Sequence, residues 1–212
     1  MGEQMLSRVA VVYDDSCRPE TTGLYVRRAL VKLVNHVEHF QPSDLAGLMI
    51  NGFDAYIFVD DGLNYPLPEM SVPSAWWAID THINYEESFN KAQAAVCIFA
   101  AQRDGALRFQ AEGLTGAKWL PLACDPFFHG RRMVDCCRDL CFIGNLFPGP
   151  RMDLIKRLRQ KWPDMFVGQR YFEQMAHTYS ESRIAFNRVS ARRTAGSASA
   201  APVPLFAGFL LA

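Results

Sequence analysis

Short apolar runs alternate along this chain with segments of helical periodicity, and this alternation limits the possible folds more than any other feature. Residues 55–59 (AYIFV), 76–79 (WWAI) and 94–100 (AAVCIFA) are such runs, rich in β-branched and aromatic side chains. Strands of a parallel sheet are apolar along their whole length because helices cover both faces of the sheet. The sequence therefore predicts an α/β protein with Rossmann-like parallel sheets.

The alternation runs in two series, which indicates two domains. The first series predicts strands at 8–13, 37–40, 55–59, 76–79, 94–100 and 118–122, and helices at 22–34, 85–93 and 104–111. The second series predicts strands at 140–143 and 165–167, and helices at 152–162 and 171–187. We expect an N-terminal Rossmann-like domain over 1–126, a linker over 127–139, and the start of a second Rossmann-like domain over 140–188.

Residues 189–212 differ in composition from the rest of the chain. They are rich in Ala and Ser, contain no acidic residue, and end in an apolar stretch without an amphipathic period. Such a composition is typical of a low-complexity tail. Our hypothesis is that the gene is truncated or frameshifted near residue 188, so that this tail is out of frame.

The amino-acid composition limits the classes of molecule that this chain is expected to bind. The 22 Lys and Arg side chains balance 22 Asp and Glu, which argues against non-specific binding to nucleic acid or to an anionic membrane. The chain has no apolar run long enough to span a bilayer and no secretory leader at its start, so we expect a cytoplasmic protein. Cys136, Cys137 and Cys141 lack the paired spacing of a zinc site, so no bound metal is expected.

Polar side chains follow nearly every predicted strand of the first series. They are Asp14, Asp15, Ser16, Asp60, Asp61, Asp80, Thr81, His82, Gln102, Arg103 and Asp125. Because the carboxyl ends of parallel strands meet at one edge of a sheet, these side chains are expected to share a cleft. Asp, Ser and Thr at strand ends also cap helices and close turns, which is the alternative for each of them.

The triplet Asp80-Thr81-His82 is the strongest catalytic candidate. A histidine near neutral pKa can act as a general base when a carboxylate holds its tautomer, and Asp60 is a candidate for that partner. A hydrogen-bonded structural histidine is an equal alternative. The candidate catalytic residues are thus His82, Asp80 and Asp60.

The second series opens with a possible phosphate site. The strand at 140–143 leads into Gly144, Asn145, a Pro-Gly-Pro loop and Arg151 at the start of a helix. Backbone N–H groups and a fixed cation in this arrangement suit a diphosphate, although strand-Gly-loop-helix units are common. Trp76, Trp77, Phe127 and Phe128 can stack on a sugar or pack in a core or domain interface.

Six segments together resemble the CgeB-like family of glycosyltransferases. They are FVDDGLNYPLP, PSAWWAIDTH, AQRDGALRF, WLPLACDP, FIGNLFPGPR and YFEQMAHTYSESRIAFNR. They occur in this order, and the likeness covers residues 8 to about 188. After the last segment this family continues with a segment like NMRVFEA, which is absent here.

The resemblance implies a two-domain GT-B glycosyltransferase of hexosyltransferase type, with no cofactor beyond its nucleotide-sugar donor. Asp80 and His82 would face the acceptor, which is a glycan, a protein or a small molecule. Gly144, Asn145 and Arg151 would lie near the donor phosphates, where basic side chains and helix termini take the place of a metal. If the tail is native, the donor half is incomplete and the chain is inactive.

Two other functions compete with this one. Asp14, Asp15 and Asp60 are spaced as in a receiver-type phosphoacceptor domain that binds Mg²⁺, although Ala100, Ala101 and Gln102 stand where that domain needs a lysine. The other is a non-catalytic fragment that binds a sugar or a protein through exposed apolar surface.

Overall fold

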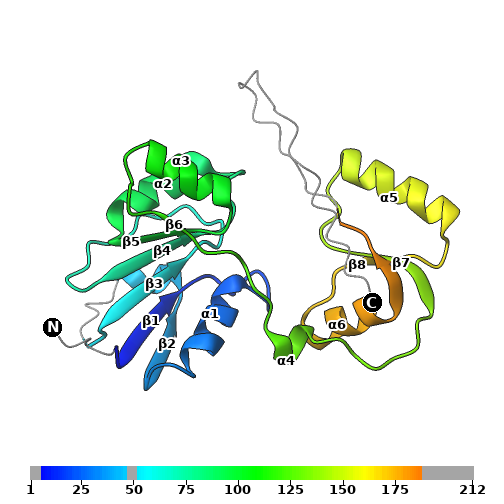
Figure 1. Cartoon of the computed structure of the whole chain (residues 1–212), viewed down its shortest axis with the longest axis horizontal. Coiled ribbons are helices and arrows are strands. Elements are labelled where there is room, and N and C mark those ends of the chain that lie inside the picture. Colours follow the sequence, from blue (N-terminus) through cyan, green and yellow to red (C-terminus); the bar gives the residue numbers. More distant parts are fainter. Residues whose placement is uncertain (1–5, 47–51, 188–212) are drawn as a thin grey trace. The chain divides into compact units, whose positions relative to one another are not determined.

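A computed structural model describes residues 6–46 and 52–187 of the chain. The chain divides into two compact units, Met1–Cys124 (the N-terminal unit) and Asp125–Ala212 (the C-terminal unit). Each is built on a parallel sheet with helices (Figure 1), which confirms the predicted α/β class. Residues 189–212, expected to form a tail, lie outside the described residues. In the part that is described, no helix has the length and apolar character that crossing a bilayer requires.

The N-terminal unit contains six parallel strands in the order β2-β1-β3-β4-β5-β6. They are β1 (Arg8–Val12), β2 (His36–Phe40), β3 (Ala55–Val59), β4 (Ser74–Ala78), β5 (Cys97–Ala100) and β6 (Lys118–Trp119). Strand β2 pairs with one edge of β1, and β3 pairs with its other edge, so that β4, β5 and β6 follow on that second side. In open parallel sheets the crevice at such a reversal is the usual ligand site.

Helices cover both faces of this sheet. They are α1 (Thr22–Leu30), α2 (Tyr85–Ala94) and α3 (Arg103–Ala111), with a 3₁₀ turn at Pro42–Ala46. Val59 and Trp77 pack on one face, towards Leu24 of α1. Phe58 and Trp76 pack on the other face together with side chains of α2 and α3. Because neighbouring residues of β3 and β4 are buried on opposite faces, these central strands are apolar without alternation.

The C-terminal unit has a three-stranded parallel sheet in the order β8-β7-β9. Its elements are α4 (Pro126–His129), β7 (Arg138–Ile143), α5 (Pro150–Lys161), β8 (Phe166–Gly168), α6 (Phe172–Ser180) and β9 (Ser182–Ala185). The core of the unit is formed by Leu140, Phe142, Ile155 and Met165. The segment predicted as a linker, 127–139, thus contains most of α4 and the start of β7.

The predicted single helix over 171–187 is wrong. Helix α6 ends at Ser180, and Ser182–Ala185 form β9, in which Ile184 lies beside Leu140 of β7. Glu181 explains the change of direction, because its carbonyl oxygen accepts the N–H groups of Cys137 and Arg138, and its carboxylate pairs with the Arg138 guanidinium. These contacts replace the next helical turn.

Candidate functional site

Asp60, at the exit of β3, holds two neighbouring strand exits together. Its Oδ2 accepts the backbone N–H groups of Ile79 at 3.1 Å and Asp80 at 3.4 Å, and its Oδ1 accepts the N–H of Gly62 at 3.1 Å. Within the described residues these backbone groups are the hydrogen-bond partners of the Asp60 side chain. The carboxylate therefore orients the loops after β3 and β4, and its role in orienting the imidazole of His82 stays a prediction.

Asp61 occupies the point where the strand order reverses. Its Oδ2 accepts the N–H of Asp14, after β1, at 3.0 Å, and its Oδ1 accepts the N–H of Leu63 at 2.9 Å. Burial raises the pKa of the Asp61 carboxyl, and the two N–H groups oppose that rise. A carboxylate thus already fills the place where a ligand phosphate would meet the backbone amide after β1. This edge of the sheet suits a ligand that donates hydrogen bonds.

Asp80, Thr81 and His82 follow β4, as predicted. Asp80 and His82 are exposed and Thr81 is buried, where its hydroxyl donates to Gln102 Oε1 at 3.0 Å. Partial desolvation raises the pKa of the Asp80 carboxyl, whereas the positive charge of His82 lowers it and the negative charge of Asp60 raises it. The structure therefore brings Asp60, Asp80 and His82 to one edge of the sheet. A carboxyl with a raised pKa beside a histidine is a suitable pair for proton transfer.

A second histidine lies at the same edge. His39, at the exit of β2, stacks on the ring of Tyr13 with 3.8 Å between centroids. Its Nε2 lies 2.9 Å from the carbonyl oxygen of Tyr13, which can only accept, so this nitrogen carries a proton. Its Nδ1 lies 3.7 Å from Asp15 Oδ2. Sequence reasoning missed His39, although the rule that polar residues at strand exits line the cleft applies to β2 as well.

In the C-terminal unit, Gly144, Asn145 and Arg151 gather at the exit of β7. The Arg151 guanidinium donates to the Asn145 carbonyl oxygen at 3.1 Å and lies over the Phe142 ring, 5.8 Å from its centroid. The same ring lies 3.1 Å from the place of a Cβ atom at Gly144, so a larger residue would crowd it. The three predicted residues are thus held together at the start of α5. A cation beside a helix N-terminus is suited to binding an anion.

Two residues that the sequence did not single out extend this cluster. Gln169, after β8, donates from its side-chain amide to Asn145 Oδ1 at 2.5 Å. The hydroxyl of Tyr171 in turn donates to Gln169 Oε1 at 3.0 Å. Gln169 and Tyr171 lie in the loop between β8 and α6, so the exits of β7 and β8 form one polar edge.

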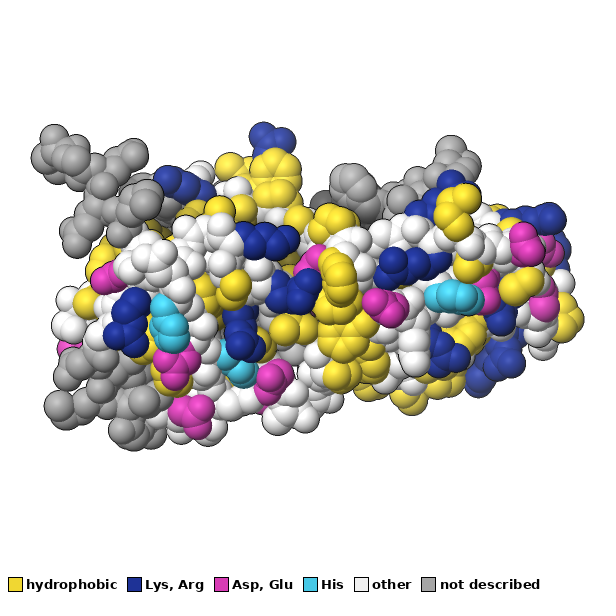
Figure 2. Space-filling view, turned by 90° about the horizontal axis from the view of Figure 1, so that it is seen from below, with side chains coloured by type: hydrophobic (Ala, Val, Ile, Leu, Met, Phe, Trp, Pro, Cys, Tyr) yellow, Lys and Arg dark blue, Asp and Glu magenta, His cyan; other side chains and the backbone are white. Residues whose placement is uncertain are grey.

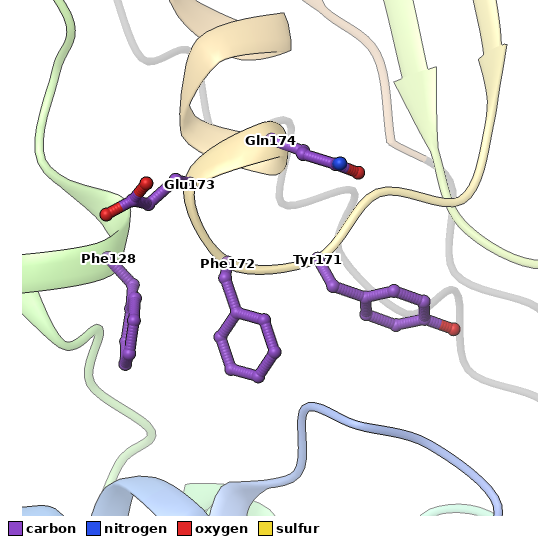
Figure 3. A pocket seen from close by; sticks show the side chains of 5 residues that line it. All are labelled: Phe128, Tyr171, Phe172, Glu173 and Gln174. Atoms are coloured by element: carbon purple, nitrogen blue, oxygen red, sulfur yellow. The ribbon is translucent and has the colours of Figure 1, made fainter.

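A shallow recess of about 360 Å³ begins beside this edge (Figure 3). It is lined by Phe128, Tyr171, Phe172, Glu173 and Gln174, all from the C-terminal unit. Phe172 has a φ of 52°, in the left-handed region that side chains with a Cβ rarely adopt. Aromatic rings dominate the lining, and an acid and an amide flank them.

Neither a protein-family model nor a curated protein matches this sequence. In the part of the chain that the structure describes, no three His, Cys, Asp or Glu side chains gather in a group that could hold a metal ion, and this includes Asp14, Asp15 and Asp60.

Proposed function

We propose that this chain is a glycosyltransferase that takes its sugar from a nucleotide-sugar donor. The C-terminal unit binds the donor, and the N-terminal unit provides the groups that act on the acceptor. The observation that supports donor binding most directly is the cluster of Arg151, Asn145 and Gln169 at the exit of β7. The resemblance to CgeB-like glycosyltransferases is the second support.

The distribution of charge fits this division of roles. Residues 1–124 carry nine Lys and Arg against fifteen Asp and Glu, whereas residues 125–212 carry thirteen against seven. The neutral total thus conceals an acidic unit and a basic unit. Lys and Arg side chains are prominent on the C-terminal unit in the face that Figure 2 shows. A basic unit attracts a diphosphate, and an acidic edge accepts hydrogen bonds from the hydroxyl groups of an acceptor.

In the proposed reaction, the strand exits of the N-terminal unit and those of the C-terminal unit have separate roles. In the N-terminal unit, His82 or Asp80 takes the proton of an acceptor hydroxyl as its oxygen bonds to the anomeric carbon of the sugar. The bond from that carbon to the donor phosphate breaks, and the nucleoside diphosphate leaves with the bonding electrons. Arg151 and the N–H groups that begin α5 stabilise the leaving diphosphate.

Donor binding is tested by calorimetric titration of the purified chain with UDP-, GDP- and dTDP-sugars. Arg151→Gln should weaken binding by about tenfold or more, because a hydrogen bond to a charged group contributes about 1.5–3 kcal/mol. Arg159→Gln is the matched control, because Arg159 is exposed in the last turn of the same helix and the same charge is lost. If the wild-type chain binds none of these donors, the proposal is wrong.

A further inference from the structure

Aspartate side chains bind the backbone N–H groups at three neighbouring strand exits of the N-terminal unit. The exits are those of β1, β3 and β4, and the aspartates are Asp14, Asp60 and Asp61. The N–H groups that they hold belong to Asp14, Ser16, Gly62, Leu63, Ile79 and Asp80. Each distance from nitrogen to carboxylate oxygen lies between 2.9 and 3.4 Å. These amides are therefore already bonded and are not open to a ligand.

This arrangement is the reverse of a phosphate site. In an open parallel sheet, free N–H groups after the strands at the reversal of strand order are the groups that bind a ligand phosphate. Here the strands on the two sides of that crevice are β1 and β3. The first amide after β1 in this crevice, that of Asp14, donates to Asp61 Oδ2 at 3.0 Å. A phosphate at this point would have to displace the carboxylate and would meet its negative charge.

The charges of the same loops also disfavour an anion. Residues 60–73 and 79–84, which follow β3 and β4, contain no Lys or Arg, and residues 13–21, which follow β1, contain one, Arg18. Lys91 of α2 is buried, and its Nζ donates to the Leu63 carbonyl oxygen at 2.5 Å and pairs with Glu87 at 3.2 Å. The carboxylates therefore dominate the charge of this edge, and a negative edge repels a phosphate.

The same carboxylates keep acceptor positions for a ligand that donates hydrogen bonds. An ionised carboxylate has about four such positions, and backbone amides take two of those on Asp61 and three of those on Asp60. The Asp80 carboxylate has no hydrogen-bond partner among the described residues, and both Asp80 and His82 are exposed. Ligand hydroxyl groups can donate to these carboxylates and accept from the imidazole N–H, so a polyol matches this edge.

We propose that this crevice takes a neutral, hydroxyl-rich acceptor, a carbohydrate without phosphate, and that Asp61 is the residue that excludes ligands with a phosphate. The inference rests on the proposed function and adds the chemical class of the acceptor. Asp61 occupies the amide of Asp14 and places a negative charge beside it, whereas Asp80 and His82 bind hydroxyl groups of the ligand. The strand exits of the two units then have opposite preferences, so the donor diphosphate binds at Arg151 and not in the acceptor crevice.

The test is a titration of the ¹⁵N-labelled full chain with inorganic phosphate, followed by NMR at the backbone amide signals of Asp14 and Leu63. In the wild type these signals should not shift. In Asp61→Ala both amides are free and one negative charge is lost, so phosphate should shift them with an affinity at least about tenfold above wild type. Asp54→Ala is the matched control, because Asp54 also accepts two backbone N–H groups but lies directly before β3, and it should gain no phosphate binding.

A second measurement uses the wild type alone and does not depend on the folding of a variant. Glucose should shift the amide signals of Asp80 and His82, and glucose 6-phosphate should bind there at least about tenfold more weakly, because its charge is repelled. Tighter binding of the phosphorylated sugar, or no shift with either sugar, overturns the assigned acceptor class.

The remaining outcomes separate this inference from the proposed function. Phosphate shifts in the wild type as large as those in Asp61→Ala overturn the role of Asp61, and so does a folded Asp61→Ala variant that binds no phosphate. If the phosphate and glucose shifts appear as expected but the wild-type chain binds no nucleotide-sugar, the proposed function fails and the exclusion of phosphate by Asp61 stands.

Discussion

Replacing Gly105 by alanine should destabilise the N-terminal unit, although alanine is the better helix former. Gly105 is buried in the first turn of α3, where that helix meets the exit of β4. A Cβ atom at this position would lie 2.3 Å from Thr81 Oγ1, 2.9 Å from its Cβ and 3.0 Å from its Cγ2. Rotating the Thr81 side chain cannot relieve the contact with its Cβ. Either the helix or the strand exit must therefore move.

Two effects oppose each other in this substitution. Alanine gains about 1 kcal/mol over glycine in a helix interior. Overpacking a buried contact costs about 1–3 kcal/mol, and losing the hydrogen bond from Thr81 to Gln102 costs about 1 kcal/mol more. We therefore expect a net loss of about 1–3 kcal/mol in the free energy of unfolding.

Urea denaturation followed by tryptophan fluorescence measures this loss, because Trp76 and Trp77 are buried in the sheet of the same unit. Gly116→Ala is the control: a Cβ atom there meets nothing within 4 Å, so the change should stay within about 0.5 kcal/mol. Combining Gly105→Ala with Thr81→Gly removes the three crowded atoms and should recover part of the loss. If Gly105→Ala is as stable as wild type or more so, helix propensity governs this site and the packing argument fails.

Three further predictions concern the carboxylates of the N-terminal unit. Asp60→Asn should lower the free energy of unfolding by about 1–3 kcal/mol, measured by urea denaturation, because an amide oxygen cannot accept all three N–H groups that the carboxylate holds. Hydrogen bonds from the backbone N–H groups of Arg8 and Ser7 lower the pKa of the Asp54 carboxyl. The contribution of this carboxylate to the free energy of unfolding is therefore complete above its unfolded pKa of about 3.9. It is lost as the pH falls through the lower pKa of the folded state. The difference in urea midpoint between wild type and Asp54→Asn should accordingly shrink between pH 6 and pH 2, and a constant difference would contradict this assignment. His82→Ala should raise the pKa of Asp80 further, seen in a carboxyl ¹³C titration by NMR, because the positive imidazole opposes the rise in the wild type.

The sequence predicted the central strands of the N-terminal sheet well because both faces of these strands are buried. The run at 55–59 coincides with β3, in which only Ile57 is partly exposed. The strand predicted at 94–100 was less accurate, because β5 begins only at Cys97. Ala94 is the last residue of α2, and Val96 is 73% exposed in the turn between the two elements. Apolar character alone cannot distinguish a turn of this kind from a strand.

The contacts that sequence reasoning missed join residues far apart in the chain. Strand β9 depends on Glu181, whose partner Arg138 lies 43 residues earlier. A helical spacing of apolar residues over 171–187 gives no sign of that contact. Gln169 with Asn145, and His39 with Asp15, are likewise pairs from neighbouring strand exits, which become visible only when the register is known. The sequence left open whether a carboxylate at a strand end serves the cleft or closes a turn. The hydrogen-bond partners of Asp60 are backbone N–H groups, as expected for a carboxylate that closes a turn.

The balanced total charge is a poor guide to what this chain binds, because the two units carry opposite excesses. Helix α5 alone holds Arg151, Lys156, Arg157, Arg159 and Lys161 against Asp153. Arg151 is fixed at the exit of β7 by its bond to Asn145, whereas the other four cations are on exposed or distal positions of the helix. Exposed charges act over a Debye length of about 8 Å at physiological salt, so in the proposed function they would speed the approach of an anionic donor. A cation held in a hydrogen-bonded cluster would instead determine how long the proposed donor stays bound, and Arg151 is therefore the side chain whose loss should appear in the dissociation rate.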